Sequence, residues 1–264
     1  MYRLLKPLLF LFSPETAHQL VFKALAILKY IPFAGNLMRL CFSYKAPALE
    51  RQVLGLNFSN PVGLAAGLDK NAEVINQMAD LGFGFVEIGS VTVAPQEGNP
   101  KPRSFRLVKD KALINRMGIN NLGVKKIVKN IQKTHPRVII GGNISKNTST
   151  PNDLAYKDFE KAFAQLYDYV DYFVINVSCP NVKDLRSLQT AENLTRLTRH
   201  LTEIRRSCAV YRPIFLTISP AISTDALDHS IDLAMPSGLD ATVASHTPPS
   251  REGPAPRKEV PHPI

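Results

Sequence analysis

Cysteine is scarce in this sequence, and the few cysteines are far apart. The 264 residues contain three, at Cys41, Cys179 and Cys208. Three cysteines with this spacing suit neither a disulfide framework nor a zinc site. We therefore expect a reducing compartment and no bound metal.

Several sequence features that define common protein classes are also missing. No uninterrupted apolar stretch reaches the ~20 residues that a membrane-spanning helix needs, and no signal peptide with a small-residue cleavage site is present. No GxGxxG opens a helix and there is no Walker-type loop, so a nicotinamide or nucleoside triphosphate site is not indicated. No carboxylate pair, Ser/His/Asp set or metal-ligand cluster suggests a different catalytic centre.

The composition is that of a globular protein with an excess of positive charge. Apolar residues make up 45% and charged residues 20%, with a net charge of +10 and a pI near 9.6. Such a charge suits nucleic acid, an anionic membrane surface or an acidic small molecule. The basic residues are scattered, and Lys125, Lys126, Lys129 and Lys133 have the spacing of a solvated helix face. We expect no nucleic-acid partner.

The first forty residues or so differ from the rest. Leu4 to Phe12 is strongly apolar, and Ser13-Pro14-Glu15 then supplies a helix cap, a first-turn proline and a favourable acid. The apolar residues that follow recur every three or four positions: Ala17, Leu20, Val21, Ala24, Leu25, Leu28 and Ile31. This stripe indicates either a helix packed on the protein's own core or an amphipathic helix lying on a membrane.

From about Leu54 onward, short apolar runs alternate with amphipathic stretches. Six runs are predicted strands: 62–65, 85–88, 138–141, 173–177, 214–218 and 241–244. Helices are predicted over 72–81, 158–170 and 191–207. Strands that are apolar on both faces indicate a parallel sheet or barrel covered by helices. The segment from Pro248 to Ile264 carries six prolines and is interpreted as a disordered tail.

Small and amide residues follow these strands, at the end where α/β barrels bind ligands. The first strand is followed by Ala66 to Lys70, which combines small residues with a fixed positive charge. The later positions are Ser90, Asn143 and the segment 176–181, together with the connection 115–121. One asparagine at a strand end is ordinarily a turn residue. Several together predict a polar wall suited to a neutral heterocycle, because an amide both donates and accepts hydrogen bonds.

Cys179 has two readings. A lone cysteine is commonly an inert buried residue. Its position between Asn176 and Asn181, at a strand end, favours a functional role instead. A thiol with a pKa near roughly 8.5 can remove a proton at neutral pH if its thiolate is stabilised.

Six motifs, in this order, resemble those of dihydroorotate dehydrogenases. They are Ala66 to Lys70, Glu87 to Thr92, Pro95 to Pro102, Asn115 to Gly118, Asn143 with Lys146 and Asn147, and Asn176 to Asn181. Each motif alone is weak, but their joint occurrence is specific. The sequence is most similar to the quinone-dependent, membrane-associated class, over residues 1 to 247.

The resemblance implies an α/β fold, a (β/α)8 TIM barrel preceded by a small N-terminal helical element. Residues 1–45 would form the quinone and membrane element, 46–247 a partial FMN-binding barrel, and 248–264 the tail. Only six of the eight β/α units are recognised, so we expect a C-terminally truncated copy. Six strands cannot close such a barrel, and we expect the chain to fold poorly and not to retain FMN.

The resemblance also implies the site residues. FMN would be held by Ala66, Gly67, Leu68, Asp69, Lys70, Ser90, Asn143 and Asn176, with Thr217 and Ser245 at two further cofactor positions. The substrate would be held by Lys70, Asn115, Arg116, Met117, Gly118, Ile119, Asn176, Asn181, His246 and Thr247. Cys179 would stand at the position of the catalytic base.

The implied reaction is the oxidation of dihydroorotate to orotate in pyrimidine biosynthesis. Cys179 would take the proton from C5 while hydride leaves C6 for the flavin, and a membrane quinone would then receive the electrons along residues 1–40. The implied location is peripheral, on the cytoplasmic face of the bacterial inner membrane.

Several residues depart from the family pattern. Thr217 stands where the family has a lysine that bonds the flavin, and His246 where it has an asparagine. Ala221, Ala241 and Pro248 replace Asp, Gly and Thr. Cysteine at position 179 is typical of the soluble class, whereas the quinone-linked class has serine there. Two alternatives therefore stay open: a soluble dihydroorotate or dihydropyrimidine dehydrogenase-like flavoprotein with another acceptor, and a non-catalytic fragment at the membrane surface.

Overall fold

The structure is a computed structural model that describes residues 2–179, 188, 191–219, 232 and 235–244. The predicted disordered tail, 248–264, lies outside these residues.

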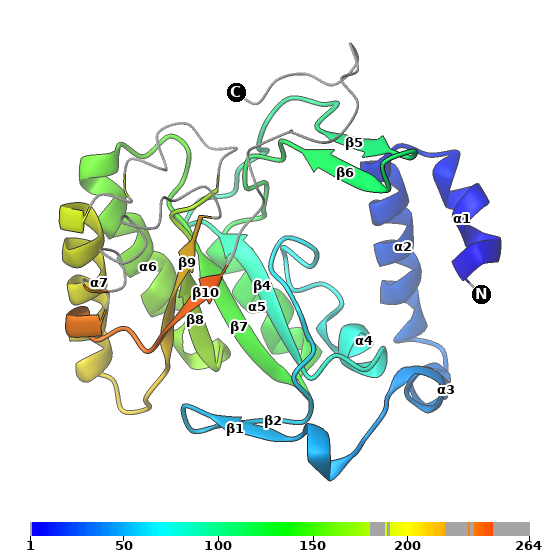
Figure 1. Ribbon diagram of the computed structural model, residues 1–264, viewed down its shortest axis with the longest axis horizontal. Coiled ribbons are helices and arrows are strands. Elements are labelled where there is room, and N and C mark those ends of the chain that lie inside the picture. The colour runs from blue at the N-terminus through cyan, green and yellow to red at the C-terminus, as the bar shows by residue number, and fades with distance from the viewer. Residues whose placement is uncertain (1, 180–187, 189–190, 220–231, 233–234, 245–264) are drawn as a thin grey trace.

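A parallel sheet forms the centre of the molecule (Figure 1). Its strands, in chain order, are β3 (Gly63–Leu64), β4 (Phe85–Val91), β7 (Ile139–Ile144), β8 (Tyr172–Ile175), β9 (Ile214–Ile218) and β10 (Ala241–Ala244). In space the order is β10-β9-β8-β7-β4-β3, so strands that are successive in the sheet are joined by crossovers. The six predicted strands and their parallel arrangement are thereby confirmed, within the part of the chain that the structure describes.

The strand limits differ from the prediction where pairing with a neighbour decides them. β9 and β10 have the predicted bounds. β4 and β7 both extend three residues further, because Val91 pairs with Ile144 beyond an irregularity in the register. This extension carries the two strands to the edge of the sheet where the polar side chains gather. β3 is shorter than predicted, with only Gly63 and Leu64 in register with β4.

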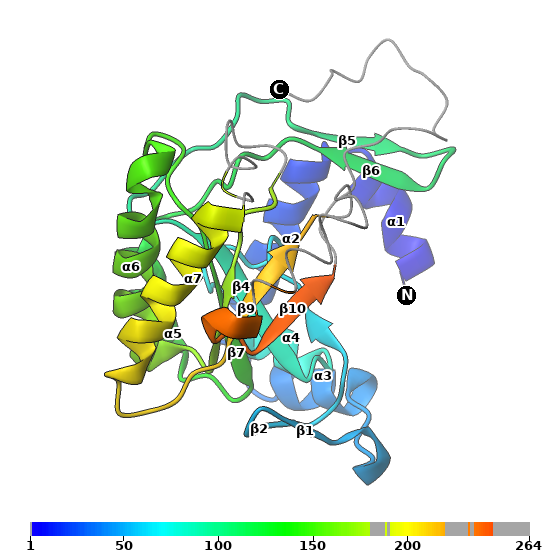
Figure 2. The same cartoon turned by 60° about the vertical axis from the view of Figure 1, so that its left-hand side comes forward.

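Four helices connect and cover these strands: α4 (Ile75–Asp80), α5 (Val124–Thr134), α6 (Ala155–Leu166) and α7 (Ala191–Arg206). Figure 2 shows α5, α6 and α7 side by side along one face of the sheet. Helix α6 was predicted three residues too late. It begins at Ala155 and ends at Leu166, and a 3-10 turn, η3 (Tyr167–Tyr169), follows it.

The core lies between these helices and the sheet. Phe163 of α6 packs against Phe173 of β8, with ring centroids 4.3 Å apart, and both side chains are fully buried. Burial on both faces explains why β8 is apolar at every position.

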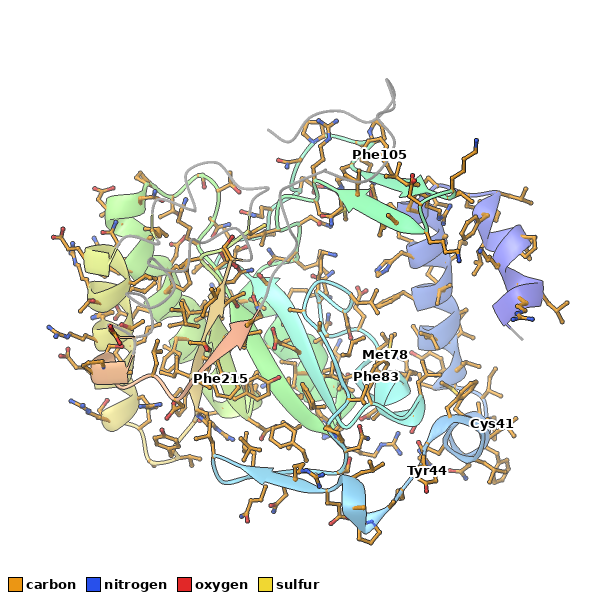
Figure 3. All side chains as sticks on the ribbon, viewed as in Figure 1. Cys41, Tyr44, Met78, Phe83, Phe105 and Phe215 are labelled. Carbon is orange, nitrogen blue, oxygen red and sulfur yellow. The ribbon has the colours of Figure 1, made fainter. Side chains whose placement is uncertain are left out.

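Three helices precede the sheet: α1 (Tyr2–Phe10), α2 (Pro14–Leu28) and α3 (Ala34–Phe42). The predicted cap is confirmed, since the Ser13 hydroxyl accepts a hydrogen bond from the Thr16 amide at 3.1 Å. Helices α2 and α3 contact α4. Met78 of α4 and the nearby Phe83 lie between the sheet and these helices (Figure 3). Among the described helices, none combines the length and the apolar character that crossing a membrane requires.

The sequence pattern did not predict two antiparallel hairpins. One pairs β1 (Arg51–Val53) with β2 (Leu56–Phe58), and the other pairs β5 (Ser104–Leu107) with β6 (Ala112–Asn115). Both are short and largely exposed, so they lack the continuous apolar runs by which the central strands were recognised. The 3-10 turns η1 (Pro47–Leu49), η2 (Asn152–Leu154) and η5 (Met235–Ser237) complete the described elements.

The core predicts a strong dependence of stability on α6. Leu166 is fully buried, whereas Leu40 of α3 is 83% exposed. Leu166→Ala should lower the free energy of unfolding by about 2–5 kcal/mol, because it removes packed methyl groups and leaves a cavity. Leu40→Ala should change it by less than about 0.5 kcal/mol. Urea unfolding of the two variants tests this, and equal losses would contradict the packing described.

Candidate functional site

Three predicted site residues meet at the C-terminal edge of the sheet. The Ser90 hydroxyl, on β4, donates to the Asn143 side-chain oxygen on β7 at 2.5 Å. The Asn176 side-chain amide, directly after β8, donates to the Ser90 oxygen at 2.7 Å. The contact depends on the parallel register, because Gly142 of β7 pairs with Ile88 on one side and Phe173 on the other.

Glu87 is hydrogen-bonded to one end of this row of side chains, at Asn143. Its carboxylate accepts from the Asn143 amide at 2.8 Å and, through its other oxygen, from the Tyr172 hydroxyl at 3.4 Å. Burial raises the pKa of Glu87, although these two hydrogen bonds partly oppose the shift. The Asn143 amide group faces Glu87, so its oxygen is directed to Ser90. The prediction had not included Glu87 in the site.

The loop after β3 is attached to the same edge. The Gly67 amide donates to the Gly89 carbonyl at 2.8 Å. Gly67 has φ +99, and no heavy atom lies within 4 Å of the place where a Cβ would stand. Such a loop exposes backbone to a flat ligand. Ala66 is half-buried and Leu68 exposed beside it.

Asp69 and Lys70 have different roles in this loop. Asp69 is fully buried and accepts the Glu73 and Val74 amides at 2.8 and 2.9 Å, so its carboxylate holds the loop together. Lys70 directs its ammonium group back to the Gly67 carbonyl. Burial lowers the pKa of Lys70, and the nearby Arg103 lowers it further. Lys70 is thus the predicted residue best placed to offer a charge to a ligand.

Cys179 lies beyond the Asn176 hydrogen bonds. The Asn176 side-chain oxygen accepts from the Ser178 amide at 3.2 Å, and the Ser145 hydroxyl donates to the Asn176 carbonyl at 3.1 Å. These contacts fix the chain immediately before Cys179, which is buried with 6% of its surface exposed.

The loop 115–119 is hydrogen-bonded to the segment that precedes the β5–β6 hairpin. The Gln96 side-chain amide donates to the carbonyls of Gly118 and Ile119 at 3.2 and 3.0 Å. The Arg116 guanidinium donates to the Pro102 carbonyl at 3.2 Å. The Asn115 side-chain oxygen accepts from the Met117 amide at 3.4 Å. These contacts hold the loop in place. The Arg116 guanidinium is hydrogen-bonded to the backbone of the protein and is not directed into the site.

Thr217 lies on β9 at the same edge, one residue beyond the Leu216–Ile175 pair. It is 6% exposed, and its hydroxyl has no hydrogen-bond partner within the described part of the chain. A buried hydroxyl without a partner is unfavourable, and a ligand or a water at this edge of the sheet would satisfy it. Four other predicted residues, Asn181, Ser245, His246 and Thr247, lie outside the described residues.

Three further residues join this site to the N-terminal helices. Arg103 is 6% exposed and makes a two-point contact with Glu15 of α2, at 2.7 and 3.2 Å. The hydrogen bond from Arg103 lowers the pKa of Glu15. His18 stacks on Phe22 at 4.2 Å, and burial and then Lys70 lower its pKa. Sequence reasoning missed Arg103, Glu15 and His18 as a group, because 88 residues separate Arg103 from Glu15.

Comparison with a sequence model of a protein family gives a match over residues 48–258, and that family is described as "Dihydroorotate dehydrogenase". A relative from Christiangramia forsetii, named dihydroorotate dehydrogenase (quinone), is 45% identical over 96% of this chain and 74% of its own length. A relative of the same name from a Psychrobacter species is 40% identical over 96% of this chain and 73% of its own length.

Solved structures agree with the family match. DHODH from Eimeria tenella in complex with ferulenol superposes with a TM-score of 0.82 at 33% identity, over 91% of this chain and 68% of that one. The ligand-free form has the same TM-score and identity, over 92% and 72%. The parallel sheet with its outer helices is therefore a TIM-barrel-like fold.

The position of Glu87 predicts a specific pH dependence. Its pKa in the folded chain is raised above its ordinary value of 4.5, so ionisation destabilises the fold. The free energy of unfolding of the wild type should therefore fall as pH rises from 4.5 through the folded pKa of Glu87. Glu87→Gln cannot ionise, so its free energy of unfolding should not show this decrease. Urea unfolding of both proteins across this range measures the difference. A difference that does not change with pH would contradict a buried, titrating Glu87.

Proposed function

The chain belongs to the dihydroorotate dehydrogenase family, and from that premise we propose that its site oxidises dihydroorotate to orotate with a flavin cofactor. The family is flavin-dependent, and we propose FMN as the flavin. Membership also supports a place in pyrimidine biosynthesis for the reaction.

The observation that carries the proposal is the hydrogen-bonded row of Ser90, Asn143 and Asn176 beside the open Gly67 loop. A flavin ring is flat and has donors and acceptors along its edge, which matches a row of amides and a loop without side-chain bulk. The unpartnered hydroxyl of Thr217 lies at the same edge of the sheet. The described residues thus fit the ring of the cofactor, and Ala66, Gly67, Leu68, Asp69 and Lys70 would form the loop that holds it.

When bound, the flavin supplies the redox chemistry by accepting the hydride from C6 of the substrate. The chain contributes orientation and proton transfer. Asn176 and the loop 115–119 would position the substrate ring, with Asn181 and Thr247 completing its contacts. Lys70 would place a positive charge near the substrate carboxylate. Cys179 would remove the proton from C5, and its burial excludes water from that step.

A quinone is the proposed electron acceptor, as the names of the relatives from C. forsetii and Psychrobacter favour. We propose that residues 1–45 form the element that brings the protein to the membrane surface, on its cytoplasmic face. The apolar side chains of α1 and α3 support this, since Leu4 and Leu40 are each 83% exposed. Glu15 and Arg103 fasten α2 beside Lys70, so a quinone that entered here would approach the flavin site.

Substitution of Cys179 tests the reaction. With FMN supplied in large excess, so that the chain need not retain it through purification, dihydroorotate without oxygen should bleach the flavin and yield orotate. Cys179→Ala should slow the bleaching by about 100-fold or more, since a positioned base contributes at least that much. Cys208→Ala is the matched control and should leave the rate unchanged. No dihydroorotate-dependent bleaching in any variant, including Thr217→Lys, would contradict the proposed function.

Restoring the lysine at position 217 tests the cofactor site. Without FMN, Thr217→Lys should lower the melting temperature, because it buries a charge in a site with 6% exposure. With FMN it should raise the melting temperature and tighten FMN binding by about tenfold, through a charged hydrogen bond. Thr242→Lys, at an exposed position on β10, is the control and should do neither. Quenching of FMN fluorescence measures the affinity, and equal effects of both variants would contradict a flavin ring beside Thr217.

A further inference from the structure

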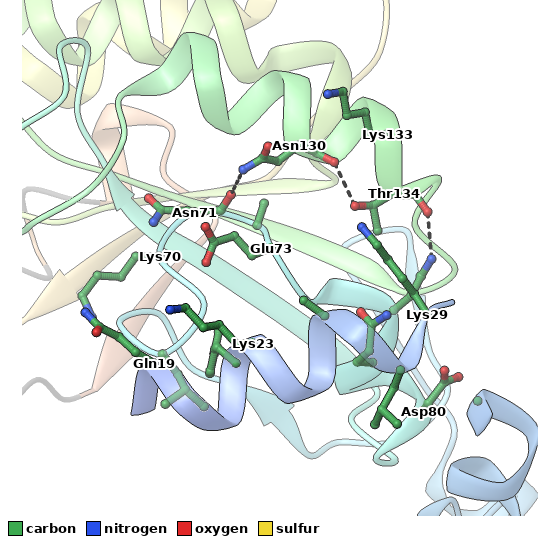
Figure 4. A pocket seen from close by; sticks show the side chains of 18 of the residues that line it. Gln19, Lys23, Lys29, Lys70, Asn71, Glu73, Asp80, Asn130, Lys133 and Thr134 are labelled. Carbon is green, nitrogen blue, oxygen red and sulfur yellow. Dashed lines mark hydrogen bonds between the residues drawn. The ribbon is translucent and has the colours of Figure 1, made fainter. Parts of the chain in front are cut away.

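A large cavity lies between two groups of elements. Helices α2 and α3 are on one side, and α4, α5 and the loop after β3 are on the other. The volume of the cavity is about 900 Å³. Figure 4 shows Lys23 of α2 and Lys29 directed into this space, opposite Asn130 and Lys133 of α5, with Lys70 at its edge beside Gln19. Most of the cavity lies away from the row formed by Ser90, Asn143 and Asn176, none of which lines it.

The walls carry an excess of positive charge. The basic lining residues are Lys23, Lys29, Arg39, Lys70, Lys126, Lys133 and Arg137. The acidic lining residues are Glu15, Glu73 and Asp80. Seven cations therefore face three carboxyl groups, which suits an anionic ligand.

The carboxyl groups neutralise only part of this excess, because Asp80 pairs with two of the lining cations, Arg39 and Arg137. Glu15 is paired with Arg103 at 2.7 Å, and Asp80 is paired with Arg39 and Arg137 at 2.5 and 2.9 Å. Burial raises the pKa of Glu73, with Lys126 opposing the shift.

Of the five remaining cations, Lys70 donates to the Gly67 carbonyl, and the other four form no ion pair within the described residues. Within the described residues, no carboxylate oxygen lies 4.0 Å or less from the ammonium nitrogen of Lys23, Lys29, Lys126 or Lys133. These four lysines are the surplus that a ligand would neutralise.

The rim of the cavity is apolar. Ile31 and Phe33 line the cavity, yet they are 50% and 80% exposed. They continue into the exposed apolar side chains of α3, where Leu37 is 62% exposed and Leu40 83%. The surface thus joins a basic recess to an apolar rim, as an amphiphilic anion requires.

We propose that this cavity binds the phosphate headgroup of an anionic membrane phospholipid, with its acyl chains along Phe33 and α3. The proposal rests on the membrane contact proposed above and identifies the lipid chemistry that the contact selects. A soluble anion would use the lysines but not the apolar rim, whereas a neutral lipid would use the rim and leave the lysines without a counter-charge.

Helix α5 offers a matched test. Lys126 and Lys133 line the cavity, whereas Lys125 and Lys129, which are also exposed and on the same helix, do not. The full chain should float with phosphatidylglycerol vesicles more than with phosphatidylcholine vesicles. The double variant Lys126→Gln/Lys133→Gln should bind phosphatidylglycerol about 25-fold more weakly, since each lysine near an anionic surface contributes roughly fivefold. Lys125→Gln/Lys129→Gln, with the same change in net charge, should lose less than about threefold, since it leaves the cavity intact.

The other outcomes separate this proposal from the membrane proposal. Equal binding to both lipids, or equal loss of binding in both double variants, would contradict the headgroup site. Either result would still agree with the proposed membrane contact. Full displacement from vesicles by millimolar glycerol phosphate at constant ionic strength would assign the cavity to a free anion and overturn the lipid. Failure to bind either vesicle would overturn both proposals. Thermal melts of the two double variants, expected to match the wild type, show that loss of binding is not loss of folding.

Discussion

The register between β4, β7 and β8 is the constraint on which the candidate site depends. It brings Ser90, Asn143 and Asn176, which are far apart in sequence, into one hydrogen-bonded row. Each of these side chains can both donate and accept a hydrogen bond. The donor-to-acceptor direction along the row is therefore set only if one end is bonded to a group that accepts. Glu87 supplies that end, because it accepts from both Asn143 and Tyr172. A shift of one residue in any strand would turn these side chains to the other face.

Ion pairs across long sequence separations attach the N-terminal helices to α4 and to the segment before β5. Arg103 holds Glu15 at the start of α2, and Asp80 at the end of α4 holds Arg39 of α3. Arg103 and Asp80 are largely buried, so each attachment carries hydrogen bonds that water does not replace. These ion pairs fix the position of the N-terminal helices relative to the loop that carries Lys70. A surface or ligand that contacts these helices is therefore held at a defined place relative to that loop.

The two faces of α5 illustrate how one helix serves two purposes. Val124, Ile127 and Ile131 are buried against the core. Its lysines divide between open solvent and the basic cavity, with Lys126 and Lys133 on the cavity side. All four lysines are exposed, as expected for a solvated face, and two of them also line the cavity. The neighbouring α2 decides which of them line the cavity.

The sequence by itself determined the central strands, the Ser13 cap and the positions of the amides, because each depends on periodicity or on neighbouring residues. Six strands were recognised from their apolar runs, a pattern that burial on both faces explains in β8. Only the tertiary structure decided that Glu87 supports Asn143, that Arg103 pairs with Glu15 and that Lys126 faces a cavity while Lys125 does not. Those contacts join segments tens of residues apart, and no local pattern encodes which distant residues packing will bring together.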